Sequence, residues 1–211
     1  MTPRELLAQG VLRLGLELPP EAGQRLLNYL ALLGKWNQTY NLTAIREPGK
    51  VVTHHLLDSL SVLPYVNTDT ITDVGSGAGL PGIPLAVAKP GSRVVLIESN
   101  HKKGAFLRQA MTELQLTNVE VITERAENWH PLFEVGVVIS RAFADLAGFV
   151  EIAGHLCSPT GVMLAMKGLY PDEEIEQLPA SVKLERVERI DVPGLRATRH
   201  LVILRPSPHP K

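Results

Sequence analysis

The sequence predicts an α/β protein whose seven-stranded, mostly parallel sheet has an antiparallel edge strand and follows N-terminal helices. Three observations predict this fold. Short β-rich runs alternate with helical stretches from residue 70 onward, which is typical of a parallel sheet covered on both faces. A glycine-rich turn at residues 73–82 follows the first run directly. The last two runs are separated by a short loop at Pro193-Gly194, which predicts an antiparallel pair at the sheet edge.

Residues 1–66 are expected to form an N-terminal helical segment packed on the main domain. Thr2 to Glu5 has the pattern of a capping box with proline at the first helical position. A second helix starts near Pro19-Pro20-Glu21, and its apolar face has helical spacing at Leu26, Tyr29, Leu30, Leu33 and Trp36. A third helix is predicted from Gly49 to Leu63, where Pro64 ends it.

The main domain is predicted to span residues 67–206. Its candidate strands are 70–74, 93–97, 119–122, 135–140, 161–166, 182–191 and 199–204. Helices of roughly 8–15 residues fit between the first five of these strands. The proline-rich tail at 207–211 is expected to be extended and disordered.

Composition narrows the class of protein. The chain has 211 residues and a formal charge of −1, with 6 basic and 6 acidic residues in 1–69 and 15 and 16 in 70–211. Contact with nucleic acid therefore needs a local basic patch. The single cysteine, Cys157, cannot form an intrachain disulfide and is expected to be structural. Without a signal-peptide pattern or an apolar run of about 18–20 residues, we expect a cytoplasmic monomer with no membrane contact.

The glycine turn narrows the cofactor to two classes. Gly75, Gly77 and Gly79 alternate after Asp73, so backbone N–H groups can approach a ligand with no Cβ in the way. The G-x-G-x-x-G match from Gly77 to Gly82 suits a dinucleotide. Three features favour S-adenosylmethionine instead: a carboxylate at Asp73 that can reach an ammonium group, the longer glycine series, and the lack of a separate substrate domain.

Further cofactor contacts are expected at the ends of the next two strands. Glu98 ends the second strand, 19 residues after Gly79, where a carboxylate can accept hydrogen bonds from both ribose hydroxyls. Ala126 and Glu127 follow the third strand, where an adenine edge would be read; Glu127 can equally be a solvated carboxylate that favours a helix start.

The substrate side is expected at the carboxyl ends of the fourth and fifth strands. Arg141 and Phe143 follow the fourth strand, and Lys167 follows the fifth. Each of them has an ordinary alternative: a surface ion pair for Arg141, the core for Phe143 and a solvated strand end for Lys167.

The helix after the second strand has positively charged residues in its first turn, where negative charge is favoured. Asn100 can cap it, and Lys102 and Lys103 then lie in its first turn. Positive charge there opposes the helix dipole by roughly 0.3–1 kcal/mol each, and an RNA phosphate would relieve that conflict. Arg108 continues the basic face. Two exposed lysines with no ligand are the alternative.

Polar residues are also dense between the N-terminal helices, where Asn37, Asn41, His54, His55 and Asp58 occur. Capping and turn contacts can account for the asparagines. Adjacent histidines project about 100° apart on a helix and make a poor metal pair. No other spacing of metal ligands is present, so no metal is expected.

These elements together resemble the bacterial small-subunit ribosomal RNA guanine-N7 methyltransferase family known as RsmG or GidB. The matching motifs cover nearly the whole chain in the family's order. They are Trp36-Asn to Asn41-Leu-Thr-Ala, His54-His55 with Asp58-Ser-Leu, Asp73-Val-Gly-Ser-Gly-Ala-Gly-Leu-Pro-Gly-Ile-Pro, Glu98-Ser-Asn-His-Lys-Lys to Phe106-Leu-Arg, Ile139-Ser-Arg-Ala-Phe143, Met166-Lys-Gly168 and Arg199-His-Leu.

The resemblance implies a Rossmann-like, S-adenosylmethionine-dependent methyltransferase fold and methyl transfer to N7 of one guanine in 16S rRNA or in the small ribosomal subunit. It implies cofactor contacts at Gly75, Leu80, Ala126, Glu127 and Arg141, beside Asp73, Ser76, Gly77, Gly79 and Glu98 from the turn and second strand. The RNA-facing candidates are Asn37, Asn41, His54, Lys102, Lys103, Arg108, Phe143, Lys167 and Arg199.

Guanine N7 has a free lone pair, so the reaction needs alignment rather than a general base, and orientation can supply up to roughly 7–11 kcal/mol. We therefore assign no catalytic residue and expect Arg141 to bind and position. Three alternatives stay open: an NAD(P)-dependent reductase, a non-catalytic RNA-binding ribosome assembly factor, and a small-molecule methyltransferase.

Overall fold

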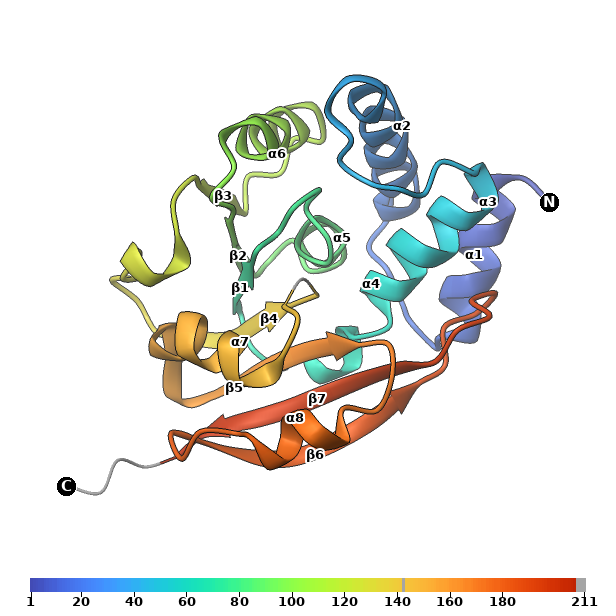
Figure 1. Cartoon of the computed structure of the whole chain (residues 1–211). Helices are drawn as coiled ribbons and strands as arrows, with labels where there is room; N and C mark the ends of the chain where they lie inside the picture. The colour runs from blue at the N-terminus through green and yellow to red at the C-terminus, as the bar shows by residue number, and fades with distance from the viewer. Residues whose placement is uncertain (142, 208–211) are drawn as a thin grey trace.

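Seven strands form one sheet in the order β3-β2-β1-β4-β5-β7-β6 in the computed structural model, which describes residues 1–141 and 143–207 (Figure 1). The strands are β1 Thr70–Val74, β2 Arg93–Ile97, β3 Val119–Ile122, β4 Val135–Ser140, β5 Cys157–Lys167, β6 Val182–Ile190 and β7 Arg199–Pro206. The pairs among β1 to β5 are parallel, whereas β7 is antiparallel to both β5 and β6. The predicted fold class is confirmed.

Strand β5 begins earlier than the sequence predicts. Cys157 pairs with Val135, and a bulge between Val135 and Val137 shifts the register before Val162 pairs with Val137. Cys157 is half-buried, and burial raises the pKa of its thiol to about 12. The thiol is therefore protonated and unreactive at neutral pH.

Helices fill the connections between parallel strands with one exception. They are α5 Gly82–Ala88, α6 His101–Glu113 and α7 Leu146–Ala153, the last of which continues into the 3-10 turn η4 Gly154–Leu156. The prediction of a longer helix after β3 is wrong, because that connection holds only the 3-10 turn η3 Ala126–Asn128. Pro131 explains this, since a proline disfavours helical backbone in the residue before it. Helix α8, Asp172–Glu176, lies between β5 and β6.

The N-terminal segment is helical, as predicted. Helix α1, Pro3–Arg13, has the expected capping box: Thr2 Oγ1 accepts a bond from Glu5 N–H, and Glu5 Oε2 accepts one from Thr2 N–H. Helix α2 spans Ala22–Tyr40. The predicted third helix is confirmed over most of its length but changes type: α3 Pro48–Val51, the π-helix η1 Val52–Leu57 and α4 Asp58–Leu60 follow one another, and the 3-10 turn η2 Leu63–Tyr65 comes after them.

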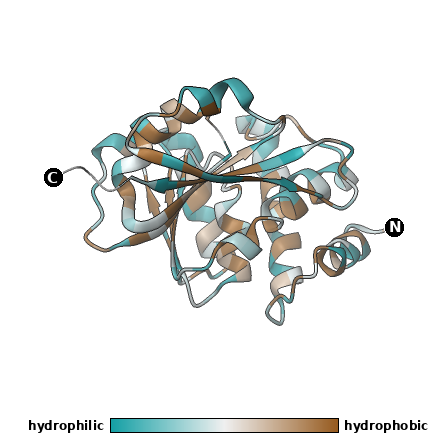
Figure 2. Cartoon of the chain, turned by 90° about the horizontal axis from the view of Figure 1, so that it is seen from below, coloured by the Kyte–Doolittle hydropathy of each residue, from teal (hydrophilic) through white to brown (hydrophobic). Residues whose placement is uncertain are grey.

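Helices lie on both sides of the sheet (Figure 2). The sheet separates two apolar clusters, because its strands alternate their side chains between the two faces. In β2, Val94 and Leu96 face α5 and α6, whereas Val95 and Ile97 face α7. The N-terminal helices extend the first cluster, with α2 packed on α5 and α6 and α4 packed on α5. The loop between β6 and β7 reaches these helices (Figure 1), where a Cβ at Gly194 would lie 3.0 Å from Thr53 Cγ2.

At the C-terminal end, the Ser207 amide donates to Ser181 O at 2.8 Å. The rest of the predicted tail, residues 208–211, lies outside the described residues. Across the described chain, no helix combines the length and apolar character that a membrane crossing requires.

Candidate active site

The glycine turn joins the carboxyl end of β1 to α5. Gly75, Gly77 and Gly79 have φ values of 70°, 58° and 86°, a left-handed conformation that side chains with a Cβ rarely adopt. The amides of Gly75 and Ser76 donate to the carbonyl oxygen of Ile97 at 2.9 and 3.0 Å. Strand β1 lies between β2 and β4, so the strand order reverses beside β1: the chain adds β2 and β3 on one side of it and β4 and β5 on the other. Open α/β sheets bind ligands at this switch point, outside the carboxyl ends of the strands.

Asp73 lies beneath this turn and is completely buried. Its Oδ2 accepts a hydrogen bond from the Gly82 amide at 2.9 Å, whereas its Oδ1 has no hydrogen-bond partner among the described residues. Burial raises the pKa of this carboxyl to about 7. An unpartnered buried oxygen is costly, so Oδ1 is suited to accept a donor from a ligand.

Glu98 holds the turn from the end of β2. Its Oε2 accepts a hydrogen bond from Gly77 N–H at 2.9 Å, and its Oε1 accepts one from Asn100 N–H at 2.8 Å. The carboxylate therefore links the glycine turn to the start of α6. Each oxygen retains further acceptor capacity, so contact with ribose hydroxyls stays a prediction.

Tyr29, which the sequence shows only as part of an apolar helix face, also supports the turn. Its hydroxyl donates to the carbonyl oxygen of Ala78 at 2.6 Å, and its ring lies 6.4 Å from that of Phe106. Two predicted contact residues are themselves mostly buried: Leu80 is in the core, and Ser76 Oγ donates to Asp73 O at 2.8 Å. Their backbone amides also bond within the protein, Ser76 N to Ile97 O at 3.0 Å and Leu80 N to Ser76 O at 3.1 Å, so a direct contact of either residue with a ligand stays a prediction.

A pocket of about 190 Å³ opens beside the turn and is called the cofactor pocket here, because the sequence predicts cofactor contacts at this turn. Its lining includes Ile97 at the end of β2 and residues of the connections that follow four strands, among them Gly75, Ala126, Glu127 and Phe143. Glu127 Oε1 accepts a bond from Arg125 Nη2 at 2.7 Å, and this arginine lowers the pKa of the carboxyl. Phe143 packs on Phe149 with ring centroids 5.2 Å apart. Phe143, which is predicted to face RNA, thus lies beside the glycine turn.

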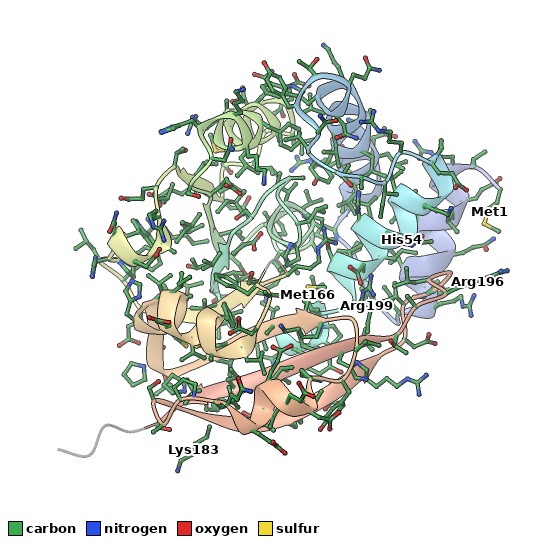
Figure 3. All side chains as sticks on the ribbon, viewed as in Figure 1. Met1, His54, Met166, Lys183, Arg196 and Arg199 are labelled. Atoms are coloured by element: carbon green, nitrogen blue, oxygen red, sulfur yellow. The ribbon has the colours of Figure 1, made fainter. Side chains whose placement is uncertain are left out.

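A second pocket, of about 430 Å³, lies between the N-terminal helices and the sheet and is called the acceptor pocket here, because it collects residues that the sequence predicts on the substrate side. Figure 3 labels His54, Met166 and Arg199 in this region. Arg141 and Lys167 also line it, as do Thr43, Ala44, Ile45, His55, Asp58 and Gly168. Of the residues predicted to face RNA, the structure collects His54, Lys167 and Arg199 here, and it adds Arg141 from the expected cofactor set.

Asp58 joins the two arginines of the acceptor pocket. Its Oδ2 lies 3.1 Å from Arg141 Nη1, and its Oδ1 lies 2.7 Å from Arg199 Nε. Arg141 Nη1 also donates to the His54 carbonyl oxygen at 3.1 Å. The carboxylate is buried, whereas about a quarter of each arginine side chain is exposed. The buried carboxylate of Asp58 therefore holds both guanidinium groups at the wall of the pocket.

Lys167 is held mainly by protein groups. Its Nζ lies 2.7 Å from Glu174 Oε2 and donates to Ala144 O at 2.9 Å. Only a tenth of the side chain is exposed. The alternative of a solvated strand end is therefore wrong, because Lys167 links the loop after β4 and the end of β5 to α8; its contact with RNA stays a prediction.

Comparison with known proteins decides the family. The family model described as "GidB: rRNA small subunit methyltransferase G" matches residues 22–202. The chain belongs to the GidB family. A relative from Nitrosospira multiformis, "Ribosomal RNA small subunit methyltransferase G", is 53% identical over 97% of this chain and 98% of its own length. A protein of the same name from Neisseria meningitidis serogroup C is 50% identical over 97% and 99%.

Solved structures of low sequence identity share the fold of this GidB protein. A SAM-dependent methyltransferase from Aquifex aeolicus superposes with a TM-score of 0.57 and 19% identity over 78% of this chain and 96% of its own. The glycopeptide N-methyltransferase MtfA, solved with S-adenosyl-L-methionine, gives a TM-score of 0.62 and 11% identity over 72% and 95%. The predicted methyltransferase fold is confirmed.

Asn37 and Asn41 shape a loop of the GidB protein that separates α2 from the acceptor pocket. Asn37 is buried, with its Nδ2 donating to Thr43 O and its Oδ1 accepting from Thr43 N, both at 2.9 Å. Thr43 Oγ1 in turn lies 2.9 Å from His55 Nε2. Burial lowers the pKa of His55 to about 4, so its ring is neutral at physiological pH. Asn41 Oδ1 accepts a bond from Arg46 Nη2 at 3.0 Å.

The start of α6 carries the predicted basic residues. Asn100 Oδ1 accepts hydrogen bonds from the backbone amides of Lys102 and Lys103 at 2.9 and 3.2 Å, which confirms the predicted cap. The Lys102 side chain is exposed and that of Lys103 is half-buried. Arg108 Nη1 donates to Thr123 Oγ1 at 2.6 Å, so this residue is turned toward the end of β3.

No group of three or more His, Cys, Asp or Glu side chains that could hold a metal ion occurs within residues 1–141 and 143–207. The candidate site of this GidB protein combines the glycine turn with the two pockets described above. Sequence reasoning missed Tyr29 and the anchoring role of Asp58. Nothing in the sequence near Tyr29 indicates that it contacts the glycine turn. The motif that contains Asp58 was recognised, but the sequence does not show that its partners are Arg141 and Arg199.

Proposed function

We propose that this protein transfers a methyl group from S-adenosylmethionine to N7 of a guanine in 16S rRNA. One structural relationship carries the proposal. Ser140 Oγ, at the end of β4, donates to Val74 O, at the end of β1, at 2.7 Å. The residues that follow these two strand ends, Arg141 and Gly75, therefore start from neighbouring positions. Gly75 lines the cofactor pocket and Arg141 lines the acceptor pocket. A methyl donor and a methyl acceptor bound there would meet across the ends of β1 and β4.

The residues of the turn suit the proposed cofactor. S-adenosylmethionine supplies an electrophilic methyl group on a sulfonium centre. Asp73 Oδ1, which lacks a protein partner among the described residues, would accept a bond from the amino group of the cofactor. The backbone of Gly75 to Gly79 would approach it without steric hindrance. Ile97, Ala126 and Phe143 give the cofactor pocket apolar walls that suit an adenine ring.

The acceptor pocket suits a reaction that needs no general base. Guanine N7 carries a lone pair, so the protein has only to hold the base in line with the methyl group. Its arginines are always protonated, and His55 is neutral because burial lowers its pKa to about 4. We assign Arg141 to binding and positioning.

RNA would approach from the side on which the acceptor pocket opens. His54 and Arg199 line that pocket, and we propose contacts with RNA at both. Asn41, Lys102, Lys103 and Arg108 would extend the contact along the N-terminal segment and the start of α6. Asn37 and Lys167 would act indirectly, because their polar atoms hold the loops that border the pocket.

The decisive experiment measures 7-methylguanosine in small-subunit RNA by nucleoside mass spectrometry, in cells with and without the gene. We expect the modification to be lost with the gene and restored by the wild-type chain. The variant Gly75→Asp, which fills the turn at a φ of 70°, should not restore it. Gly91→Asp is the matched control, because a Cβ at Gly91 meets nothing within 4 Å.

Each rival function predicts a different result. Undiminished 7-methylguanosine in the deletion strain would exclude methylation of this RNA and favour a small-molecule acceptor. A ribosome-assembly defect in the deletion strain that Gly75→Asp still corrects would indicate a non-catalytic factor. The reductase alternative receives no support from the methyltransferase relatives described above, and calorimetry with NADPH and with S-adenosylmethionine tests it directly.

We further propose that the protein acts in the cytoplasm as a monomer. Every residue assigned to the two pockets comes from one chain, so one copy can form both of them. Sedimentation at working concentration tests this, and a dimer would contradict it.

A further inference from the structure

We infer that Asp58 is a positioning residue for methyl transfer: its buried carboxylate fixes Arg141 and Arg199 in the acceptor pocket and offsets their positive charge. This inference rests on the proposed function and adds a residue that touches neither cofactor nor reacting atoms. The two arginines come from different parts of the fold, since Arg141 follows β4 and Arg199 begins β7.

The geometry supports a positioning role. The two oxygens of Asp58 bind different arginines, at 3.1 Å for Arg141 Nη1 and 2.7 Å for Arg199 Nε. Arg199 Nη1 also donates to Thr198 O at 3.0 Å. A guanidinium has five N–H donors, and these contacts with protein use only part of each set. The donors that bind no group among residues 1–141 and 143–207 can contact O6 of guanine or phosphate oxygens, which arginine recognises readily.

The chemistry explains why a carboxylate should stand behind these arginines. The ring gains a positive charge when N7 is methylated, so uncompensated cations nearby would oppose the transition state. Asp58 offsets one of the two guanidinium charges, and Glu174 lies 2.7 Å from Lys167 at the border of the same pocket. The pocket thus offers hydrogen-bond donors to RNA, while the two carboxylates limit the repulsion between its cationic side chains and the positively charged methylated ring.

The test is Asp58→Asn, which keeps the shape and one acceptor oxygen but removes the charge. It uses the full chain with small subunits from a deletion strain. We expect the single-turnover rate to fall by about 10–100-fold. Binding of RNA should stay equal or tighten, with a salt dependence steeper by up to about one log–log unit, because the pocket becomes more positive. A merely structural role would weaken binding and rate together.

Glu185 provides the matched control, because its carboxylate also contacts two arginines, Arg186 and Arg205, but at β6 and β7 away from both pockets. Glu185→Gln should leave rate and binding unchanged. If Asp58→Asn does not fold, Arg199→Lys keeps the charge and loses the guanidinium geometry. We expect it to bind RNA within about twofold of wild type and to transfer methyl about 10-fold more slowly or worse.

A wild-type rate in Asp58→Asn, or in Arg199→Lys if the first variant does not fold, overturns the inference. A parallel loss of RNA affinity and rate in Asp58→Asn also overturns it. These outcomes differ from a failure of the proposed function, in which the wild-type chain itself would not methylate the subunit.

Discussion

The hydroxyl of Tyr29 in α2 donates a hydrogen bond to the carbonyl oxygen of Ala78, 49 residues further along the chain and 2.6 Å away. Tyr29 is completely buried, and burial raises the pKa of its phenol far above the ordinary value. The hydroxyl therefore remains a donor at every physiological pH. Through this bond the N-terminal segment takes part in shaping the glycine turn.

Replacement of Tyr29 by Phe should weaken cofactor binding. The variant keeps the ring contact with Phe106 but leaves the Ala78 carbonyl without its donor, a loss of about 1–3 kcal/mol for a buried group. We expect a lower free energy of unfolding in urea and a lower affinity for S-adenosylmethionine by calorimetry. Tyr40→Phe, at an exposed position of the same helix, should change neither. Unchanged affinity in Tyr29→Phe would refute this role.

The sequence predicted the sheet well because short β-rich runs and the glycine turn are local signals. The continuous apolar run from Val94 to Ile97 reflects helices on both faces of the sheet. The missing helix after β3 shows the limit of this reasoning. Alternation of strands and helices implies a connection of some kind, but it does not require that the connection be helical.

The site was predicted less completely, because its important contacts join residues far apart in the chain. Arg141 and Arg199 lie 83 and 141 residues from Asp58, and no local pattern encodes those pairs. The side of the sheet that Phe143 faces likewise depends on packing with Phe149. Residue type and order indicated the chemistry, whereas the division into two pockets required the fold.

Glu98→Gln should distort the glycine turn. Both carboxylate oxygens accept backbone N–H groups, from Gly77 at 2.9 Å and Asn100 at 2.8 Å. Glutamine has one acceptor oxygen, so its NH₂ group would face a donor. We expect the affinity for S-adenosylmethionine to fall about tenfold, since hydrogen bonds to a charged group are worth about 1.5–3 kcal/mol. Glu120→Gln, which changes an exposed carboxylate paired with Arg93, is the control. Equal affinities in calorimetry would argue against the linkage.

Gly82→Ala tests the close approach of α5 to β1. A Cβ at this position would overlap Leu96 Cδ2 and lie 2.7 Å from Asp73 Oδ2. Overpacking of this kind typically costs about 1–3 kcal/mol, and we expect that loss in urea unfolding together with weaker cofactor binding. Gly23→Ala in α2 is matched to it, because a Cβ there meets nothing within 4 Å. That variant should gain about 0.5–1 kcal/mol. Similar effects of the two substitutions would contradict the packing argument.

Asp73 should make the stability of the cofactor-free protein depend on pH. Burial raises the pKa of its carboxyl from 3.8 to about 7 in the folded chain. Between these values the folded state binds a proton that the unfolded chain has released. The contribution of Asp73 to stability is therefore fully present below pH 3.8 and is lost as the pH rises through about 7.

Asp73→Asn removes that titration while keeping an acceptor for the Gly82 amide. We expect the free energy of unfolding in urea of the wild type, relative to that of the variant, to fall by a few kcal/mol between pH 4 and pH 8. The slope should be about 1.4 kcal/mol per pH unit between the two pKa values of Asp73. The variant should also bind S-adenosylmethionine more weakly at pH 8, where the wild-type carboxylate can pair with an ammonium group. A constant difference in stability between the two proteins across this range would show that Asp73 titrates alike in the folded and unfolded chains.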